Sequence, residues 1–70
     1  MLLNVMELIA RFPLAAECFR AFNHEHEFET WENGGYWHIC RTIVNGKIRY
    51  IATEIEKQDY RAVGRRPNQG

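Results

Sequence analysis

The sequence is poor in the features that would assign it to a special class of protein. Two cysteines, Cys18 and Cys40, in a chain of 70 residues are too few for a dense disulfide framework. We expect both to be buried free thiols, one in a helix and the other in a central strand. No apolar run approaches a membrane span or the core of a signal peptide. The sequence therefore favours a cytoplasmic protein without a membrane partner.

The chain also lacks net charge, because nine Lys and Arg residues balance nine Asp and Glu residues. A nucleic-acid-binding protein usually has a basic excess, since its affinity comes largely from phosphate neutralisation. The balance conceals an asymmetry along the chain. Residues 1–32 contain six acids and two bases, whereas residues 33–70 contain three acids and seven bases. The two parts therefore carry net charges of −4 and +4, and we expect an electrically two-sided molecule.

The short chain limits the size of the hydrophobic core. Its composition, 46% hydrophobic and 26% charged, is typical of a folded globular domain. A core of this size rarely supplies more than roughly 3–5 kcal/mol of stability. Since neither disulfides nor a metal are expected, a partner protein or self-association would add to that stability. A homo-oligomer is thus one of the open alternatives.

The N-terminal part carries a helix signal. Asn4 and Glu7 have the spacing of a capping box, so we expect a helix from about Val5 to Asn23. Pro13 interrupts this segment, because proline lacks an N–H and disfavours helical geometry in the residue before it. The alternatives are two short helices or one kinked helix, and we favour the kinked helix because the apolar spacing passes through Pro13 without a slip. Spacings of three and four place six apolar residues on one helical face: Val5, Leu8, Phe12, Ala15, Phe19 and Phe22.

Two turn signals, Gly34-Gly35 and Asn45-Gly46, interrupt the β-forming part of the chain. Both dipeptides tolerate the positive φ of tight hairpin turns. They predict an antiparallel meander of three strands over residues 24–33, 36–44 and 47–55. The predicted fold class is therefore α+β, with the N-terminal helix packed on one side of a three-stranded sheet.

Alternation along the strands sorts the side chains of the sheet into two faces, provided that both turns are two-residue loops. The better candidate to contact the helix consists of Phe28, Thr30, Trp37, Ile39, Arg41, Ile43, Ile48, Tyr50 and Ala52. The opposite face, called the mixed face below, consists of Glu27, Glu29, Trp31, Tyr36, His38, Cys40, Thr42, Val44, Lys47, Arg49, Ile51 and Thr53. Its composition is neither that of a core nor that of a plain solvent-exposed surface.

The C-terminal part gives weaker signals. We expect one domain over residues 1–64, with a short helical or irregular segment at its end, and a mobile basic tail over residues 65–70. In an alternative arrangement, Tyr60 and Val63 fold back over Ile51 and Ile55. The C-terminal segment would then cover the mixed face.

No set of residues predicts a catalytic or cofactor site. His24, His26, His38 and Cys40 are suitable zinc ligands, but the expected register puts the first two opposite the face that holds the other two, so we predict no metal site. His38 and Cys40 point in parallel along one strand and have no third orienting group, which argues against a nucleophile and base. Gly34-Gly35 lies in a hairpin and not before a helix, unlike a phosphate-binding loop. We therefore predict no catalytic activity and no cofactor.

The mixed face favours a protein-binding function. The centres of protein interfaces are enriched in Trp, Tyr and Arg, and flanking charges orient the partner. The expected function is a non-catalytic module that binds a protein stoichiometrically, for instance as an inhibitor. Very small proteins of this kind are common among phage and mobile-element inhibitors of host machinery, including anti-defence proteins. The predicted partner-binding residues are Glu27, Glu29, Trp31, Tyr36, His38, Lys47 and Arg49.

The alternative function is a nucleic-acid-binding regulator. Aromatic side chains on a sheet can stack unpaired bases while basic residues hold phosphates. Glu27 and Glu29 oppose this function, because they would repel a phosphate backbone from the same face. The residues that would contact nucleic acid are Lys47, Arg49, Arg61, Arg65 and Arg66.

Overall fold

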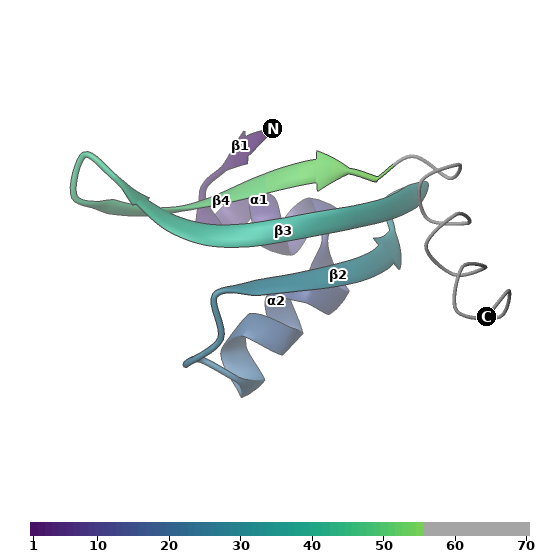
Figure 1. Cartoon of the computed structure of the whole chain (residues 1–70), viewed down its shortest axis with the longest axis horizontal. Coiled ribbons are helices and arrows are strands. Elements are labelled where there is room, and N and C mark those ends of the chain that lie inside the picture. Colours follow the sequence, from purple (N-terminus) through teal and green to yellow (C-terminus); the bar gives the residue numbers. More distant parts are fainter. Residues whose placement is uncertain (56–70) are drawn as a thin grey trace, which may run out of the picture.

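The computed structural model describes residues 1–55, which form two helices on one face of a four-stranded antiparallel sheet (Figure 1). The helices and strands occur in the order β1 (Leu2–Leu3), α1 (Val5–Arg11), α2 (Pro13–Ala21), β2 (Glu27–Glu32), β3 (Gly35–Val44) and β4 (Lys47–Glu54). Within the sheet the order is β1-β4-β3-β2. The predicted α+β class, with N-terminal helical structure packed on a meander, is confirmed.

The helical segment is divided at Pro13, so our preference for one kinked helix was wrong. α1 ends at Arg11, and Phe12 has the non-helical angles φ −133° and ψ 65°. α2 then begins with Pro13, whose fixed φ and missing N–H suit the first position of a helix. The non-helical angles of Phe12 follow from the steric restriction that proline places on the residue before it.

The predicted apolar face of the helical segment is buried in its centre and exposed at its ends. Leu8, Phe12, Ala15 and Phe19 are buried, so the apolar spacing continues across the break between the helices. Val5, at the start of α1, and Phe22, which caps α2, are about half exposed instead. The fully buried contribution of the helical segment to the core therefore comes from its four central residues.

The predicted capping box starts α1. The Asn4 side-chain oxygen accepts a hydrogen bond from the Glu7 backbone N–H at 2.8 Å. In return, the Asn4 backbone N–H donates to Glu7 Oε1 at 2.9 Å. Two N–H groups at the helix end are thereby satisfied.

We expect Asn4→Ala to lower the free energy of unfolding by about 1 kcal/mol, because it removes the acceptor of the capping box. Urea denaturation followed by circular dichroism would measure the loss. Asn4→Ser, which restores a side-chain oxygen at the cap, should recover most of it. Equal stability of the alanine variant and the parent would contradict a role for the cap.

The first hairpin turn lies one residue earlier than predicted. Asn33 and Gly34 occupy its two central positions with φ of +52° and +79°, and Gly35 is the first residue of β3. Positive φ at both positions favours Asn-Gly. Gly35 has no such requirement: a Cβ there would lie 2.6 Å from Glu54 Oε2, the end of an exposed, flexible side chain that can move away. The second turn is at Asn45-Gly46, as predicted.

The shift of the first turn changes the cross-strand partners but not the two faces. Glu32 pairs with Gly35 and Trp31 with Tyr36. Moving a two-residue turn by one residue displaces the pairing by two residues, and side chains alternate with a period of two. The predicted assignment of side chains to the two faces is therefore retained in the structure.

The first strand, β1, was not predicted, so the expectation of three strands was wrong. Leu2 pairs with Ile51 and Leu3 with Tyr50. The N-terminal ammonium donates to the Ala52 carbonyl at 3.0 Å, and the Ala52 N–H donates to the Met1 carbonyl at 2.8 Å. A strand of two residues is too short to show an alternating pattern, so only its contacts with β4 reveal it.

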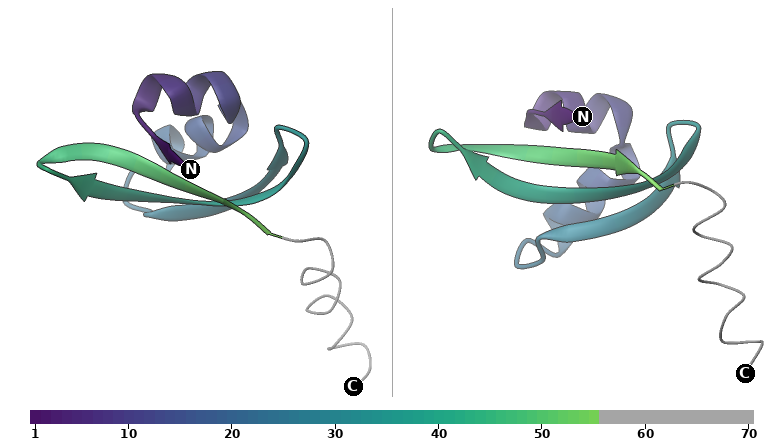
Figure 2. Two further views of the ribbon diagram at one scale, coloured as in Figure 1. Left: turned by 90° about the horizontal axis from the view of Figure 1, so that it is seen from above. Right: turned by 45° about the horizontal axis from the view of Figure 1, so that its top comes forward.

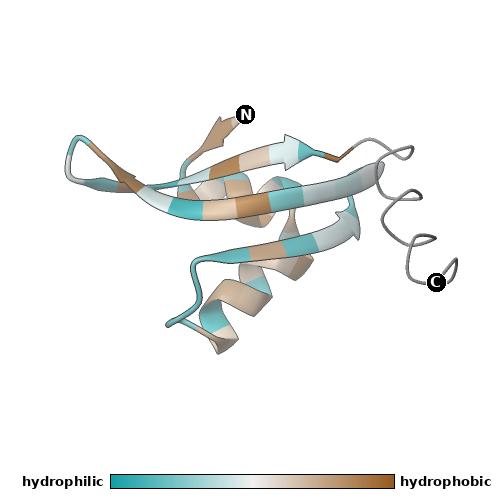
Figure 3. Cartoon of the chain, viewed as in Figure 1, coloured by the Kyte–Doolittle hydropathy of each residue, from teal (hydrophilic) through white to brown (hydrophobic). Residues whose placement is uncertain are grey.

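The core lies between the helices and the predicted helix-facing side of the sheet. Its buried residues are Leu3, Leu8, Phe12, Ala15, Phe19, Ile39, Tyr50 and Ala52. Phe19 contacts both Phe28 and Tyr50 edge to face, with centroid distances of 4.8 Å and 5.1 Å. Figure 3 shows the alternation of polar and apolar residues along the first half of β2 that this packing requires.

Two residues predicted to contact the helix are exposed instead. Ile43 and Ile48 face each other near the end of the β3–β4 hairpin, and 62% and 52% of their surfaces are exposed. The hairpin extends beyond the helices, as Figures 1 and 2 show. Two helices of seven and nine residues are too short to cover its whole length.

Cys18 and Cys40 are free, as expected, but they are partly buried rather than buried. Neither α1 nor α2 has the length and apolar character that a membrane crossing requires. The predicted domain boundary after residue 64, the basic tail and the packing of Tyr60 and Val63 lie outside the described residues.

Candidate functional site

Among residues 1–55, the mixed face is the side of the sheet that carries no helix. In Figure 2, α1 and α2 lie together on the opposite side. Pairing between β2 and β3 sets Glu29 opposite His38 and Trp31 opposite Tyr36. Pairing between β3 and β4 places the basic residues on the same face. The structure therefore gathers the seven predicted partner-binding residues on one surface.

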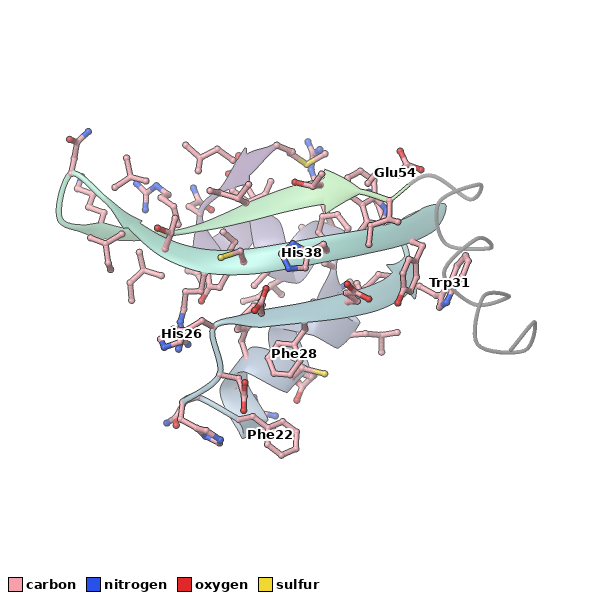
Figure 4. All side chains as sticks on the ribbon, in the orientation of Figure 1. Phe22, His26, Phe28, Trp31, His38 and Glu54 are labelled. Atoms are coloured by element: carbon pink, nitrogen blue, oxygen red, sulfur yellow. The ribbon has the colours of Figure 1, made fainter. Side chains whose placement is uncertain are left out.

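Trp31 and Tyr36 form an aromatic pair beside the first hairpin turn. Their ring centroids are 4.6 Å apart, and the rings are tilted by 43°. Trp31, which Figure 4 shows at the end of β2, remains 54% exposed although it contacts Tyr36. A shallow pocket of about 280 Å³ lies next to this pair and includes Glu54 in its lining. The pair stabilises the hairpin and also offers apolar surface to a partner.

Glu27 and Glu29, called the acidic row below, follow one another along β2 on this face. Glu27 Oε1 lies 2.7 Å from His38 Nε2, and Glu29 Oε1 accepts a hydrogen bond of 2.7 Å from the Tyr36 hydroxyl. The Tyr36 hydroxyl is neutral and leaves the Glu29 charge uncompensated. Among residues 1–55, no Lys or Arg forms an ion pair with either carboxylate. The acidic row therefore keeps negative charge at the surface.

The basic residues of the mixed face lie on the far side of β3 from the acidic row. Lys47 pairs with Val44, and Arg49 pairs with Thr42 near the end of the hairpin. Lys47 is exposed, whereas Arg49 is partly buried and donates to the Ile48 carbonyl at 2.7 Å. Arg61, Arg65 and Arg66 lie outside the described residues. In the described part, the acidic row and the two basic residues thus occupy different strands.

The possible metal ligands are not gathered into one site. His24 lies in the segment before β2, with its Nε2 3.5 Å from Glu25, and His26 directly precedes β2. His38 and Cys40 lie on β3. Within residues 1–55, no three His, Cys, Asp or Glu side chains are close enough together to hold a metal ion.

Two residues that sequence reasoning missed hold β2 at its ends. Glu32 accepts hydrogen bonds of 3.0 Å from the N–H groups of both Leu14 and Ala15, at the start of α2. Arg41 donates to the carbonyls of Asn23 and Glu25, at 2.7 Å and 2.9 Å, ahead of β2. Neither contact has a local signal in the sequence, because its partners are at least 16 residues away. Together they position the strand that carries the acidic row.

Comparison of the chain with protein-family models, with curated proteins and with solved structures found no match.

Proposed function

We propose that this protein is a non-catalytic module that binds another protein through the mixed face and acts stoichiometrically, by covering a surface of its partner. One observation carries the proposal. The strand register collects aromatic, acidic and basic side chains on the face that the helices leave uncovered.

The chemistry of this face suits a protein partner. Trp31 offers a large apolar surface, and its side chain already packs against Tyr36. The Trp31 side chain therefore loses less conformational entropy on binding than an unconstrained side chain would lose. Interface centres are enriched in Trp, Tyr and Arg, and Arg49 supplies the third type. The separation of acidic and basic residues would set the orientation of the partner.

We expect Trp31→Ala and Arg49→Glu each to weaken partner binding at least tenfold, because truncation of an interface hot spot costs about 2 kcal/mol or more. A tagged protein would first capture its partner from nuclease-treated lysate, and the affinity of the purified pair would then be measured. Both variants should remain folded, since both side chains lie outside the core, and loss of the cross-strand contact with Tyr36 should cost Trp31→Ala about 1 kcal/mol or less.

Matched controls lie on the helix side of the molecule. Met6→Ala removes an exposed apolar side chain from α1, and Arg20→Glu reverses an exposed charge on α2. Both should bind the partner as the parent does. Normal binding by the Trp31 and Arg49 variants would rule out the mixed face as the site.

A nucleic-acid-binding function is the second candidate, and the β3–β4 hairpin favours it. Between His38 and Thr53 the chain contains no acid, and Lys47 and Arg49 lie on the mixed face. Arg41 lies on the opposite face and donates to the carbonyls of Asn23 and Glu25. A salt titration separates the two functions. Phosphate contacts weaken steeply as salt concentration rises, whereas an apolar protein interface persists.

A further inference from the structure

β2 forms one edge of the sheet and has no strand on its outer side among the described residues. The Arg41 N–H donates to the His26 carbonyl at 2.7 Å, in register with the β2–β3 ladder. Hydrogen-bonded and non-hydrogen-bonded pairs alternate in an antiparallel ladder. Even-numbered residues of β2 therefore direct their backbone groups toward β3. Glu27 and Glu29 direct theirs to the outer edge of β2, where no other strand of residues 1–55 pairs with them.

The two residues whose backbone groups point to the outer edge, Glu27 and Glu29, are also the residues of the acidic row. A strand added antiparallel to β2 would form hydrogen-bonded pairs with Glu27 and Glu29. Residues directly opposite each other share a face of the sheet, with Cβ atoms about 5 Å apart. Since neither carboxylate is paired with Lys or Arg within residues 1–55, basic side chains are favoured at these two positions of the added strand.

The other side of the same edge is apolar. Phe28, which lies between the two acids, is partly buried against α2. Phe22 is 52% exposed, and its ring centroid is 6.4 Å from that of Phe28 (Figure 4). The residue of an added strand opposite Phe28 would contact this aromatic surface. An apolar residue is therefore favoured between the two basic ones.

A second copy of β2 does not fit this edge. Antiparallel pairing of two β2 strands would set acids of the two copies opposite or diagonal to each other, and like charges placed opposite each other destabilise a sheet. Acidic residues on an edge strand discourage self-pairing for this reason. The strand is also held before binding, because Glu32 and Arg41 anchor its two ends.

We propose that β2 binds an extended segment of the partner protein by strand addition, and that this segment carries Lys or Arg at alternate positions with apolar residues between them. The proposal rests on the protein-binding function proposed above. It assigns the acidic row and the outward-directed backbone groups of Glu27 and Glu29 to recognition of a basic, amphipathic strand.

A fluorescent eight-residue peptide of alternating lysine and valine tests the proposal by fluorescence anisotropy with the full-length protein. We expect saturable binding. The same peptide with glutamate in place of lysine should bind at least about tenfold more weakly, because its charges oppose the acidic row. Absence of saturable binding by the lysine peptide would overturn the proposal.

Backbone methylation tests the hydrogen-bonded ladder separately from charge. N-methylation of the lysine residues removes the N–H groups that would donate to β2, and we expect binding at least about tenfold weaker, as loss of several hydrogen bonds implies. N-methylation of the valine residues affects only N–H groups that point away from β2, so that peptide should bind like the parent peptide. Equal binding by both methylated peptides would overturn strand addition.

A matched pair of protein variants locates the site. Glu27 and Glu17 have equally exposed side chains, at 65%, and lie on β2 and α2. Glu27→Lys should weaken binding of the lysine peptide at least about tenfold, whereas Glu17→Lys should change it little. Equal effects of the two variants would overturn the assignment to β2. If the peptide fails to bind but the partner still requires Trp31, strand addition is wrong and the proposed protein-binding function stands.

Discussion

Replacing Phe12 with alanine is expected to leave most of the protein unfolded at 25 °C. The Phe12 side chain is fully buried at the junction of α1 and α2, and its ring contacts Trp37 edge to face with a centroid distance of 5.1 Å. Truncation of a buried phenylalanine costs about 3–5 kcal/mol. A core of this size supplies roughly the same amount in total. The loss should therefore abolish the cooperative transition in urea or on heating, measured by circular dichroism.

Two further variants separate core packing from helix propensity. Leu14→Ala truncates an exposed residue two positions later, and we expect a change within about 0.5 kcal/mol. Phe12→Leu keeps an apolar side chain at the junction and should remain folded, with a smaller loss of stability. A Phe12→Ala protein with a cooperative transition close to that of the parent would contradict the packing of this junction against the sheet.

Glu32→Ala is expected to lower the free energy of unfolding by about 1–3 kcal/mol, although the residue lies on an edge strand. Phe12 at the N-cap of α2 supplies no side-chain hydrogen bond. The Glu32 carboxylate replaces it by accepting the N–H groups of Leu14 and Ala15, and it also accepts a bond from the Thr30 hydroxyl at 2.8 Å. Removing it leaves these donors without their acceptor. Chemical denaturation would measure the loss.

The control for this prediction is Glu27→Ala, which removes the same side chain from a more exposed position on the same strand. We expect a change of less than about 1 kcal/mol, as for other surface substitutions. Glu32→Gln should fall between Glu32→Ala and the parent, because an amide keeps one of the two acceptor oxygens. Equal stability of the Glu27 and Glu32 alanine variants would show that the carboxylate does not cap α2.

The sheet was largely predictable because its signals are local. The turn at Asn45-Gly46 is specified by the two residues that form it, because both tolerate positive φ. Along the strands on either side, side chains alternate between the two faces with a fixed period of two. The first turn was placed one residue late, since Gly34-Gly35 and Asn33-Gly34 both allow positive φ. The side-chain faces were retained because the resulting shift in pairing is even.

The errors arose where the deciding contact is distant in sequence. The two residues of β1 become a strand only by pairing with β4, almost 50 residues later. The α2 cap provided by Glu32 likewise depends on hydrogen bonds between residues that lie 17 and 18 positions apart in the sequence. None of these contacts has a periodic or local pattern that would reveal it.

The sequence by itself determined the fold class, the capping box at Asn4 and the residues that share the mixed face, because turn preference, capping and alternation act over a few neighbouring residues. Only the tertiary structure decided which face of the sheet α1 and α2 leave uncovered and which long strand lies at the edge of the sheet among residues 1–55. It also anchored that strand through Glu32 and Arg41. These features depend on how separate segments pack, and packing is a property of the whole chain rather than of any local stretch.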